Sequence, residues 1–158
     1  LAFALAQHRA ECEFRSGDLA RAEARLAGLA GQAANLPELA AITQLQLELL
    51  LTDGRREEAV GVGLAYLDRA GISWSRQPSA ADVACEWARM WRALADHPIE
   101  RLRDQRPMTD PEVSATMRVL VELMQPAWYT DDNLRTMVVV RMVNLSLSHG
   151  NSDDSSMV

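Results

Sequence analysis

Residues 37–71 read PELAAITQLQLELLLTDGRREEAVGVGLAYLDRAG, and this stretch decides the fold. Its apolar residues recur at helical spacing, and Pro37 suits the first turn of a helix that runs to Thr52. The dipeptide Asp53-Gly54 predicts a tight turn, after which a second helix continues to residue 70. Because the connection is short, we expect the two helices to pack antiparallel as a hairpin.

The N-terminal residues predict a similar hairpin, with helices over 1–15 and 19–30 joined by a turn at Gly17. Gly17 and Gly54 are 37 residues apart, and an alanine follows each of them five residues later. Small residues at such positions let two helices approach closely, as in tetratricopeptide repeats. The second unit fits that pattern less well than the first, which indicates a degenerate repeat.

The C-terminal half continues the helical pattern, and no segment shows the strict alternation of a half-buried strand. Capping patterns at 79–82 and 109–112 each open a helix, and another helix runs from Leu134 to His149. We expect residues 151–156 to be the polar lead-in to a further helix that the end of the chain truncates.

These patterns predict an all-α fold of tandem antiparallel helical hairpins that form a right-handed, tetratricopeptide-like (TPR-like) superhelix. Residues 1–71 supply two TPR-like hairpins. Residues 72–158 supply further hairpins of the same superhelix, with the last helix truncated.

The charge balance argues against two classes of partner. The chain has 16 basic residues, all of them arginine, and 22 acidic residues, so its formal net charge is −6. We therefore expect no nucleic acid as a partner, because a surface that follows phosphates needs a basic excess. We also expect no membrane contact, since the chain lacks both a polybasic patch and an apolar run of about 18 residues.

Cys12 and Cys85 are the only cysteines, too few for a disulfide framework. We expect both thiols to be reduced and largely buried, in a cytoplasmic protein. His8, Glu11 and Cys12 lie within one helical turn and offer ligands to a metal ion, but they lack the further ligands of a firm site. We interpret His8 and Glu11 as surface residues and Cys12 as a core residue, and we predict no metal site.

A family resemblance covers essentially the whole chain and is most specific in its C-terminal half. Tyr129-Thr130-Asp131 is followed by RMVNLSLSHGNS at 141–152, and PMTDPE stands upstream at 107–112. This pattern resembles part of very large bacterial signalling proteins. Those proteins join a serine/threonine-kinase-like region, an AAA/STAND-type ATPase, a long helical-repeat region, a GAF domain and often a sensor histidine kinase. The resemblance implies that this chain is a piece of the helical-repeat region behind the ATPase.

The catalytic motifs of that family have no counterpart in this chain. A phosphate-binding loop of the Gly-x4-Gly-Lys type needs a lysine, and the sequence contains none. A protein-kinase core likewise needs a strand lysine and a His-Arg-Asp loop, and both are missing from the sequence. We therefore expect no enzymatic activity, no catalytic residues and no cofactor.

Two acidic pairs, Asp131-Asp132 and Asp153-Asp154, have two interpretations. Paired carboxylates can bind a cation or do acid–base work. However, both pairs stand where helices are expected to start, and there a carboxylate satisfies free backbone amides. We interpret them as helix caps, and Asp110 in the same way.

Four tryptophans, Trp74, Trp87, Trp91 and Trp128, have the size and the N–H group to line a ligand cleft. Trp87 and Trp91 stand four residues apart, which indicates one helix stripe packed in the core. Trp74 falls in a predicted loop, so we expect it to contact a partner or a neighbouring repeat.

Arg141 and Asn144 stand three residues apart on an otherwise apolar helix, where an unpaired polar group is costly. The arginine fork suits a carboxylate or backbone carbonyls, from the 109–112 turn or from a preceding helix. The alternative is a contact with an anion or peptide on the concave face. A structural network is the interpretation we favour, and both residues stay candidates for partner binding.

The function expected from sequence is a non-catalytic interaction or linker segment that positions neighbouring domains. Its partners are other domains of the same polypeptide or separate proteins, and the apolar N-terminal residues 1–5 favour pairing with another copy. The alternative is a sensing module that binds a small molecule or peptide in the superhelix groove. A small helical enzyme is a third hypothesis, which no recognisable nucleophile–base pair supports.

Overall fold

The helices begin and end at the turns that the sequence marks. The structure, a computed structural model, describes residues 2–95 and 107–151, and no strand occurs among them. The helices are α1 (Ala2–Arg15), α2 (Leu19–Ala30), α3 (Leu36–Thr52), α4 (Arg56–Arg69), α5 (Ala80–Ala95), α6 (Pro111–Thr130) and α7 (Asp132–His149). The all-α prediction is confirmed for the described residues, and the predicted truncated helix at the C-terminus lies outside them.

The predicted capping residues open the later helices. Asp131 Oδ1 accepts a hydrogen bond from the backbone N–H of Leu134 at 2.8 Å, at the start of α7. At the start of α5, Ser79 and Asp82 form the predicted capping box. Asp82 Oδ2 accepts a hydrogen bond from the backbone N–H of Ser79 at 2.8 Å, and Ser79 Oγ accepts one from the backbone N–H of Asp82 at 3.2 Å. Asp110 caps α6. These bonds satisfy amide groups that a helix start otherwise leaves without partners.

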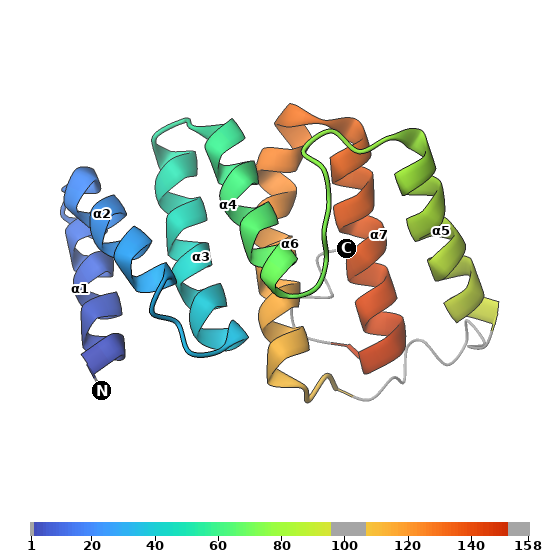
Figure 1. The fold of residues 1–158 in the computed structure, drawn as a ribbon, viewed down its shortest axis with the longest axis horizontal. Helices are drawn as coiled ribbons and strands as arrows, with labels where there is room; N and C mark the ends of the chain where they lie inside the picture. Colours follow the sequence, from blue (N-terminus) through green and yellow to red (C-terminus); the bar gives the residue numbers. More distant parts are fainter. Residues whose placement is uncertain (1, 96–106, 152–158) are drawn as a thin grey trace.

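Two antiparallel pairs, α1–α2 and α3–α4, form the N-terminal half of a single row of helices (Figure 1). Gly17 and Gly54 make the turns of these pairs at φ of 86° and 76°, values that residues with a Cβ rarely adopt. Ala22 and Ala59, five residues on, are fully buried at the helix crossings. The first two predicted hairpins are therefore present.

Spatial order departs from chain order at α5. Helix α6 packs against both α3 and α4, α7 packs against α6, and α5 lies beyond α7 at the end of the row (Figure 1). We had expected the hairpins to follow one another along the chain. The physical reason for the difference is apolar area: α6 buries eight residues along its length, whereas α5 buries only Glu86 and Met90. The helix with the broader apolar face takes the position with more neighbours.

The main hydrophobic core extends from α1 to α7 but leaves α5 out. Helices α4 and α6 approach closely in this core, where a Cβ on Gly63 would stand 2.6 Å from Leu123 Cδ1. Nearby, the hydroxyls of Tyr66 and Thr116 form a buried hydrogen bond of 3.1 Å. Helix α5 joins α7 through a separate small cluster, which consists of Met90, Val140 and Leu147.

Two predictions of buried side chains are wrong. Trp87 and Trp91, expected in the core, are 38% and 63% exposed and stack on each other with ring centroids 6.4 Å apart. Cys12 and Cys85, expected to be largely buried, are both exposed. For α5 the reason is position, because α7 covers the Met90 side of the helix and leaves the tryptophan side open.

Candidate functional site

Arg141 and Asn144 face the same residue, Glu86 of α5. Arg141 Nη2 donates to Glu86 Oε1 at 2.5 Å, and its Nε donates to Oε2 at 3.1 Å. Asn144 Nδ2 donates to the Glu86 carbonyl oxygen at 3.4 Å and lies 3.5 Å from its Oε2. The sequence predicts a carboxylate or backbone carbonyl partner for Arg141, from the 109–112 turn or from a preceding helix. The structure shows that the partner is a carboxylate and that it comes from a preceding helix.

Glu86 is the buried centre of this arrangement. It is 4% exposed, whereas the side chain of Arg141 is 15% exposed and that of Arg89 is 54% exposed. Arg89 Nη1 donates to Glu86 Oε1 at 3.1 Å. A carboxylate at this depth is stable only when it is paired and hydrogen-bonded. The Glu86 cluster, as we name Glu86, Arg89, Arg141 and Asn144, therefore supplies polar partners within the contact between α5 and α7.

Sequence-based reasoning missed Glu86, although a signal was present. Glu86 stands three residues after Val83 and four before Met90, so it shares the inward face of an amphipathic helix with them. A carboxylate on that face needs a cation from another element. Arg141, the one arginine within the apolar stretch 137–147, was its natural partner.

Trp74 covers the outer side of Arg141. Its ring centroid lies 5.5 Å from the guanidinium carbon, a cation–π contact. The loop that carries Trp74 is held by buried Ile72 and by a 2.5 Å hydrogen bond from Ser73 Oγ to Asp68 Oδ1. This loop, α5 and α7 enclose a groove of about 390 Å³. The groove is lined by residues that include Trp74, Asp82, Cys85, Glu86, Arg89 and Arg141.

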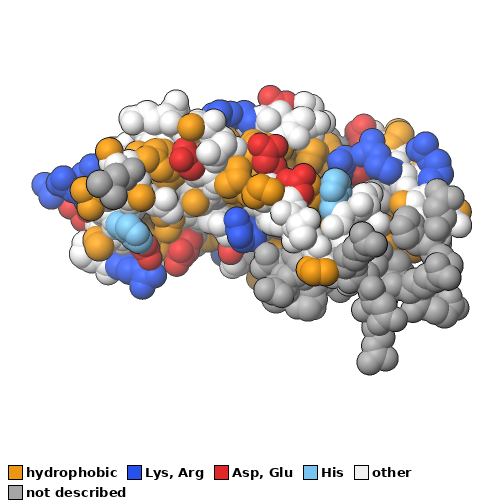
Figure 2. Space-filling model, turned by 90° about the horizontal axis from the view of Figure 1, so that it is seen from below, with side chains coloured by type: hydrophobic (Ala, Val, Ile, Leu, Met, Phe, Trp, Pro, Cys, Tyr) orange, Lys and Arg blue, Asp and Glu red, His pale blue; other side chains and the backbone are white. Residues whose placement is uncertain are grey.

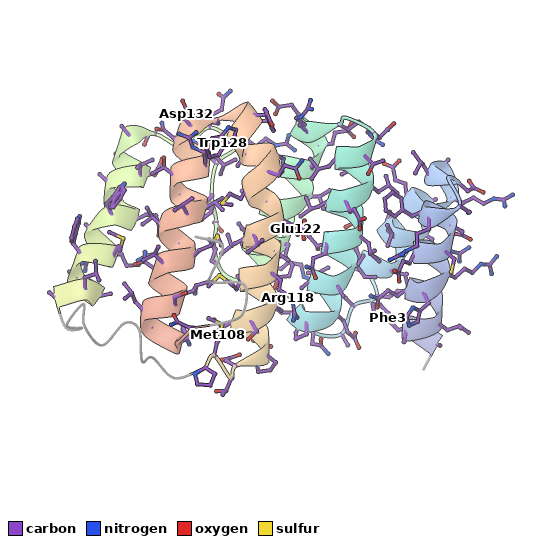
Figure 3. All side chains as sticks on the ribbon, turned by 180° about the vertical axis from the view of Figure 1, so that it is seen from behind. Phe3, Met108, Arg118, Glu122, Trp128 and Asp132 are labelled. Atoms are coloured by element: carbon purple, nitrogen blue, oxygen red, sulfur yellow. The ribbon has the colours of Figure 1, made fainter. Side chains whose placement is uncertain are left out.

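A second groove is formed by α1, α3 and α6, the helices nearest the viewer in the middle and right of Figure 3. The α1/α3/α6 groove has a volume of about 570 Å³. Its lining consists of Gln7, Glu11, Ala41, Gln44, Leu45, Glu48 and Glu122. At Glu122 it adjoins a more apolar pocket of about 400 Å³ on α6, beside the exposed Trp128 (Figure 3).

Arginine–carboxylate pairs tie the N-terminal helices together. Arg25 of α2 donates to both oxygens of Glu13 on α1, at 2.8 and 2.7 Å. These hydrogen bonds hold the pKa of Glu13 below its usual value of 4.5. Arg55 connects Glu23 of α2 with Glu58 at the start of α4. Figure 2 shows acidic and basic side chains interspersed along the row.

The remaining sequence candidates do not form a site. His8 Nδ1 lies 3.7 Å from Glu11 Oε2, and Cys12 is exposed. Within 2–95 and 107–151, no group of three or more His, Cys, Asp or Glu residues is placed to hold a metal ion. Asp131 is confirmed as a cap, whereas the pair 153–154 lies outside the described residues.

No family model matches the chain, and the comparisons with curated proteins and with solved structures find no match either. In the part of the chain that the structure describes, no helix has the length and apolar character needed to cross a membrane. Support for a functional proposal must therefore come from the fold, the two grooves and the sequence resemblance.

Proposed function

We propose that the chain is a non-catalytic interaction and linker segment of a cytoplasmic, multidomain bacterial signalling protein that contains ATPase and kinase domains. The resemblance of 107–112 and 129–152 supports this setting. The architecture supports the role, because the pairs α1–α2, α3–α4 and α6–α7 stand in one row and each packs on the next. A row of this kind holds whatever flanks it at a defined separation and offers a long surface to partners.

The finer fold that we propose is a TPR-like right-handed superhelix in which α6 and α7 act as the third hairpin. In its favour, α6 contacts both helices of the α3–α4 pair. Helices α1, α3 and α6 then correspond to the first helix of each hairpin and together line one face. Helix α5 is an addition at the end of this row.

The observation that carries the interaction role is the α1/α3/α6 groove and the aromatic pocket beside it. Trp128 and Tyr129 are 60% and 67% exposed at that pocket, although both are large aromatic residues. Exposed apolar surface with a polar surround is typical of protein–protein contacts, and aromatic side chains supply much of the affinity there.

The test starts from the reading frame on both sides of the chain. The flanking domains are expressed separately and titrated onto the purified chain by isothermal titration calorimetry. We expect one of them to bind, and Trp128→Ala and Glu48→Lys each to weaken binding by about tenfold or more. Glu57→Lys, at an exposed position of α4 outside the groove, is the matched control.

Two results would contradict this role. One is that neither flanking domain binds the chain. The other is that Glu57→Lys weakens binding as much as Glu48→Lys does, because the effect would then reflect net charge and not the groove.

A second candidate function, ligand sensing, is favoured by the groove beside Trp74. There an aromatic ring and the guanidinium groups of Arg89 and Arg141 line one polar groove of about 390 Å³. That size is within the range of small-molecule sites. A thermal-shift screen against a metabolite panel tests the proposal: a true ligand should raise the melting temperature of the wild-type chain and not that of Trp74→Ala. A panel in which no compound stabilises the chain would count against sensing.

A further inference from the structure

Helix α5 is attached to the rest of the molecule through one helix. Of the other described helices, α5 packs closely only against α7, whereas α6 packs against α3, α4 and α7. The apolar part of the attachment is a small cluster separate from the main core. It consists of buried Met90, Val140 and Leu147, with partly buried Ala93, Leu94 and Val143 packed against them. The free energy needed to open a structural element rises with the apolar contacts it must break. Among the described helices, α5 and α1 at the two ends of the row bury the fewest residues, so we expect α5 to open without the main core.

The large aromatic residues of α5 do not strengthen this attachment. Trp87 and Trp91 are not part of the apolar cluster with α7; they stack on each other and are 38% and 63% exposed. The most buried contacts of α5 lie on its inner face, where Glu86 binds Arg141 and, four residues later, Met90 packs on Val140 and Leu147. Partly buried Ala93 and Leu94 extend this apolar contact. The Glu86 carboxylate fixes the position of α5 along α7, because Arg141 donates hydrogen bonds to both of its oxygens.

On α7, the residues under α5 have the properties of a helix-docking site. Arg141 is a largely buried cation, 15% exposed, and the Trp74 ring lies on its other side. Asn144 adds an amide donor, and its Oδ1 is a buried oxygen for which the described residues supply no hydrogen-bond partner. A groove of this kind recognises apolar and charged anchors at helical spacing.

We propose that this face of α7 is an exchangeable helix-docking site and that α5 is its resident occupant. The partner it fits is an amphipathic helix of another protein with a carboxylate four residues before a large apolar side chain, the pattern that Glu86 and Met90 provide. Charge complementarity to Arg141 selects that partner. The inference goes beyond the proposed scaffold role and does not depend on the α1/α3/α6 groove.

Hydrogen exchange of the wild-type chain tests whether α5 opens by itself. Amides of α5 should exchange at least about tenfold faster than those of the central helix α3, because opening α5 leaves the main core intact. If the α5 amides exchange only as fast as those of α3, then α5 opens only with the whole molecule, and the proposal is overturned.

Binding in trans tests the docking site itself. The probe is a fluorescein-labelled peptide with the sequence of residues 80–95, measured by fluorescence anisotropy against the full chain. A Glu86→Gln substitution in the chain weakens the resident helix, so the peptide should bind this variant about tenfold more tightly than it binds the wild type. The same peptide carrying Glu86→Gln is the matched control, and it should bind at least about tenfold more weakly than the wild-type peptide.

A second variant covers the case in which Glu86→Gln fails to fold. Met90→Ala removes apolar contacts between α5 and α7 and leaves both Glu86 and the α7 surface unchanged. It should therefore also increase the affinity of the chain for the peptide. Equal binding of the two peptides, or binding that persists when the chain also carries Arg141→Met, would overturn the proposal. The proposal would also be overturned if Glu86→Gln or Met90→Ala chains formed dimers as their concentration rises. The occupant of the site would then be a second copy of the chain.

Discussion

The contact between Gly63 of α4 and Leu123 of α6 gives a sharp test of where α6 lies. A Cβ on Gly63 would meet Leu123 Cδ1 at 2.6 Å and two further atoms of that side chain at 3.3 Å. Leu123 is fully buried, so it can give way only by moving against other core side chains. Overpacking of this kind costs about 1–3 kcal/mol. The higher helix propensity of alanine offsets this cost by about 1 kcal/mol.

Gly61, two residues earlier in α4, is the matched control. Its Cβ would meet the guanidinium of Arg76, an exposed side chain that can move aside. Helix propensity and the entropy of the unfolded chain change equally in Gly61→Ala and Gly63→Ala, so the difference between the two variants isolates the contact with Leu123. We expect Gly63→Ala to be less stable than Gly61→Ala by about 1–3 kcal/mol.

Urea unfolding followed by circular dichroism measures this difference. With a slope of about 2 kcal/mol per molar urea, a difference of 2 kcal/mol separates the two midpoints by about 1 M. In a Leu123→Ala background the clash is gone, and Gly63→Ala should then stabilise by about 1 kcal/mol. Equal midpoints for Gly61→Ala and Gly63→Ala would refute the reasoning, because α6 could not then lie against α4 as described.

Three further predictions concern charged groups. Arg141→Met should destabilise the chain by about 2–3 kcal/mol, because the exposed Arg89 is then the only described cation on the buried Glu86 carboxylate. Arg89→Met should cost less than about 1 kcal/mol, and equal melting temperatures of the two variants would contradict the structural role. Because Arg25 lowers the pKa of Glu13, the stability that this pair adds is present above pH 4.5 and is lost as the pH falls through the lowered value. The urea midpoint of Glu13→Gln should therefore fall less steeply on acidification than that of the wild type, and parallel curves would disprove the link. Asp131→Ala removes the cap of α7 and should lower the free energy of unfolding, measured by thermal unfolding, by about 1 kcal/mol. Asp131→Asn should leave stability largely unchanged, because asparagine also caps helices.

Local features of the fold were predictable because they depend on neighbours in the sequence. The turn at Gly54, the capping box at 79–82 and the cap at Asp131 need only residues within one helical turn, and all three are present. The buried stripe of α5 was not predictable. Trp87 and Trp91 have the spacing of a core stripe, but spacing does not reveal how many helices surround the one that carries it.

The candidate site was predictable in part. Arg141 and Asn144 stood out because an apolar helix leaves such groups without partners, and both are paired in the structure. Their partner Glu86 is 55 positions before Arg141, too far for any local pattern to connect them. The sequence predicts that Trp74 lies in a loop and contacts a partner or a neighbouring repeat. The structure places it in that loop, with its ring over the guanidinium group of Arg141.

The sequence by itself determined which segments are helical, where they begin and end, and which of them form the first two hairpins. Each of these properties follows from periodicity, caps and turns within a few residues. Only the tertiary structure decided that α6 precedes α7 and α5 in the row, that Glu86 is the carboxylate on Arg141, and that Trp87 and Trp91 face outward. Those outcomes depend on which helix buries more apolar surface against α3 and α4. Helix α6 takes that position, and of the described helices only α7 packs closely against α5.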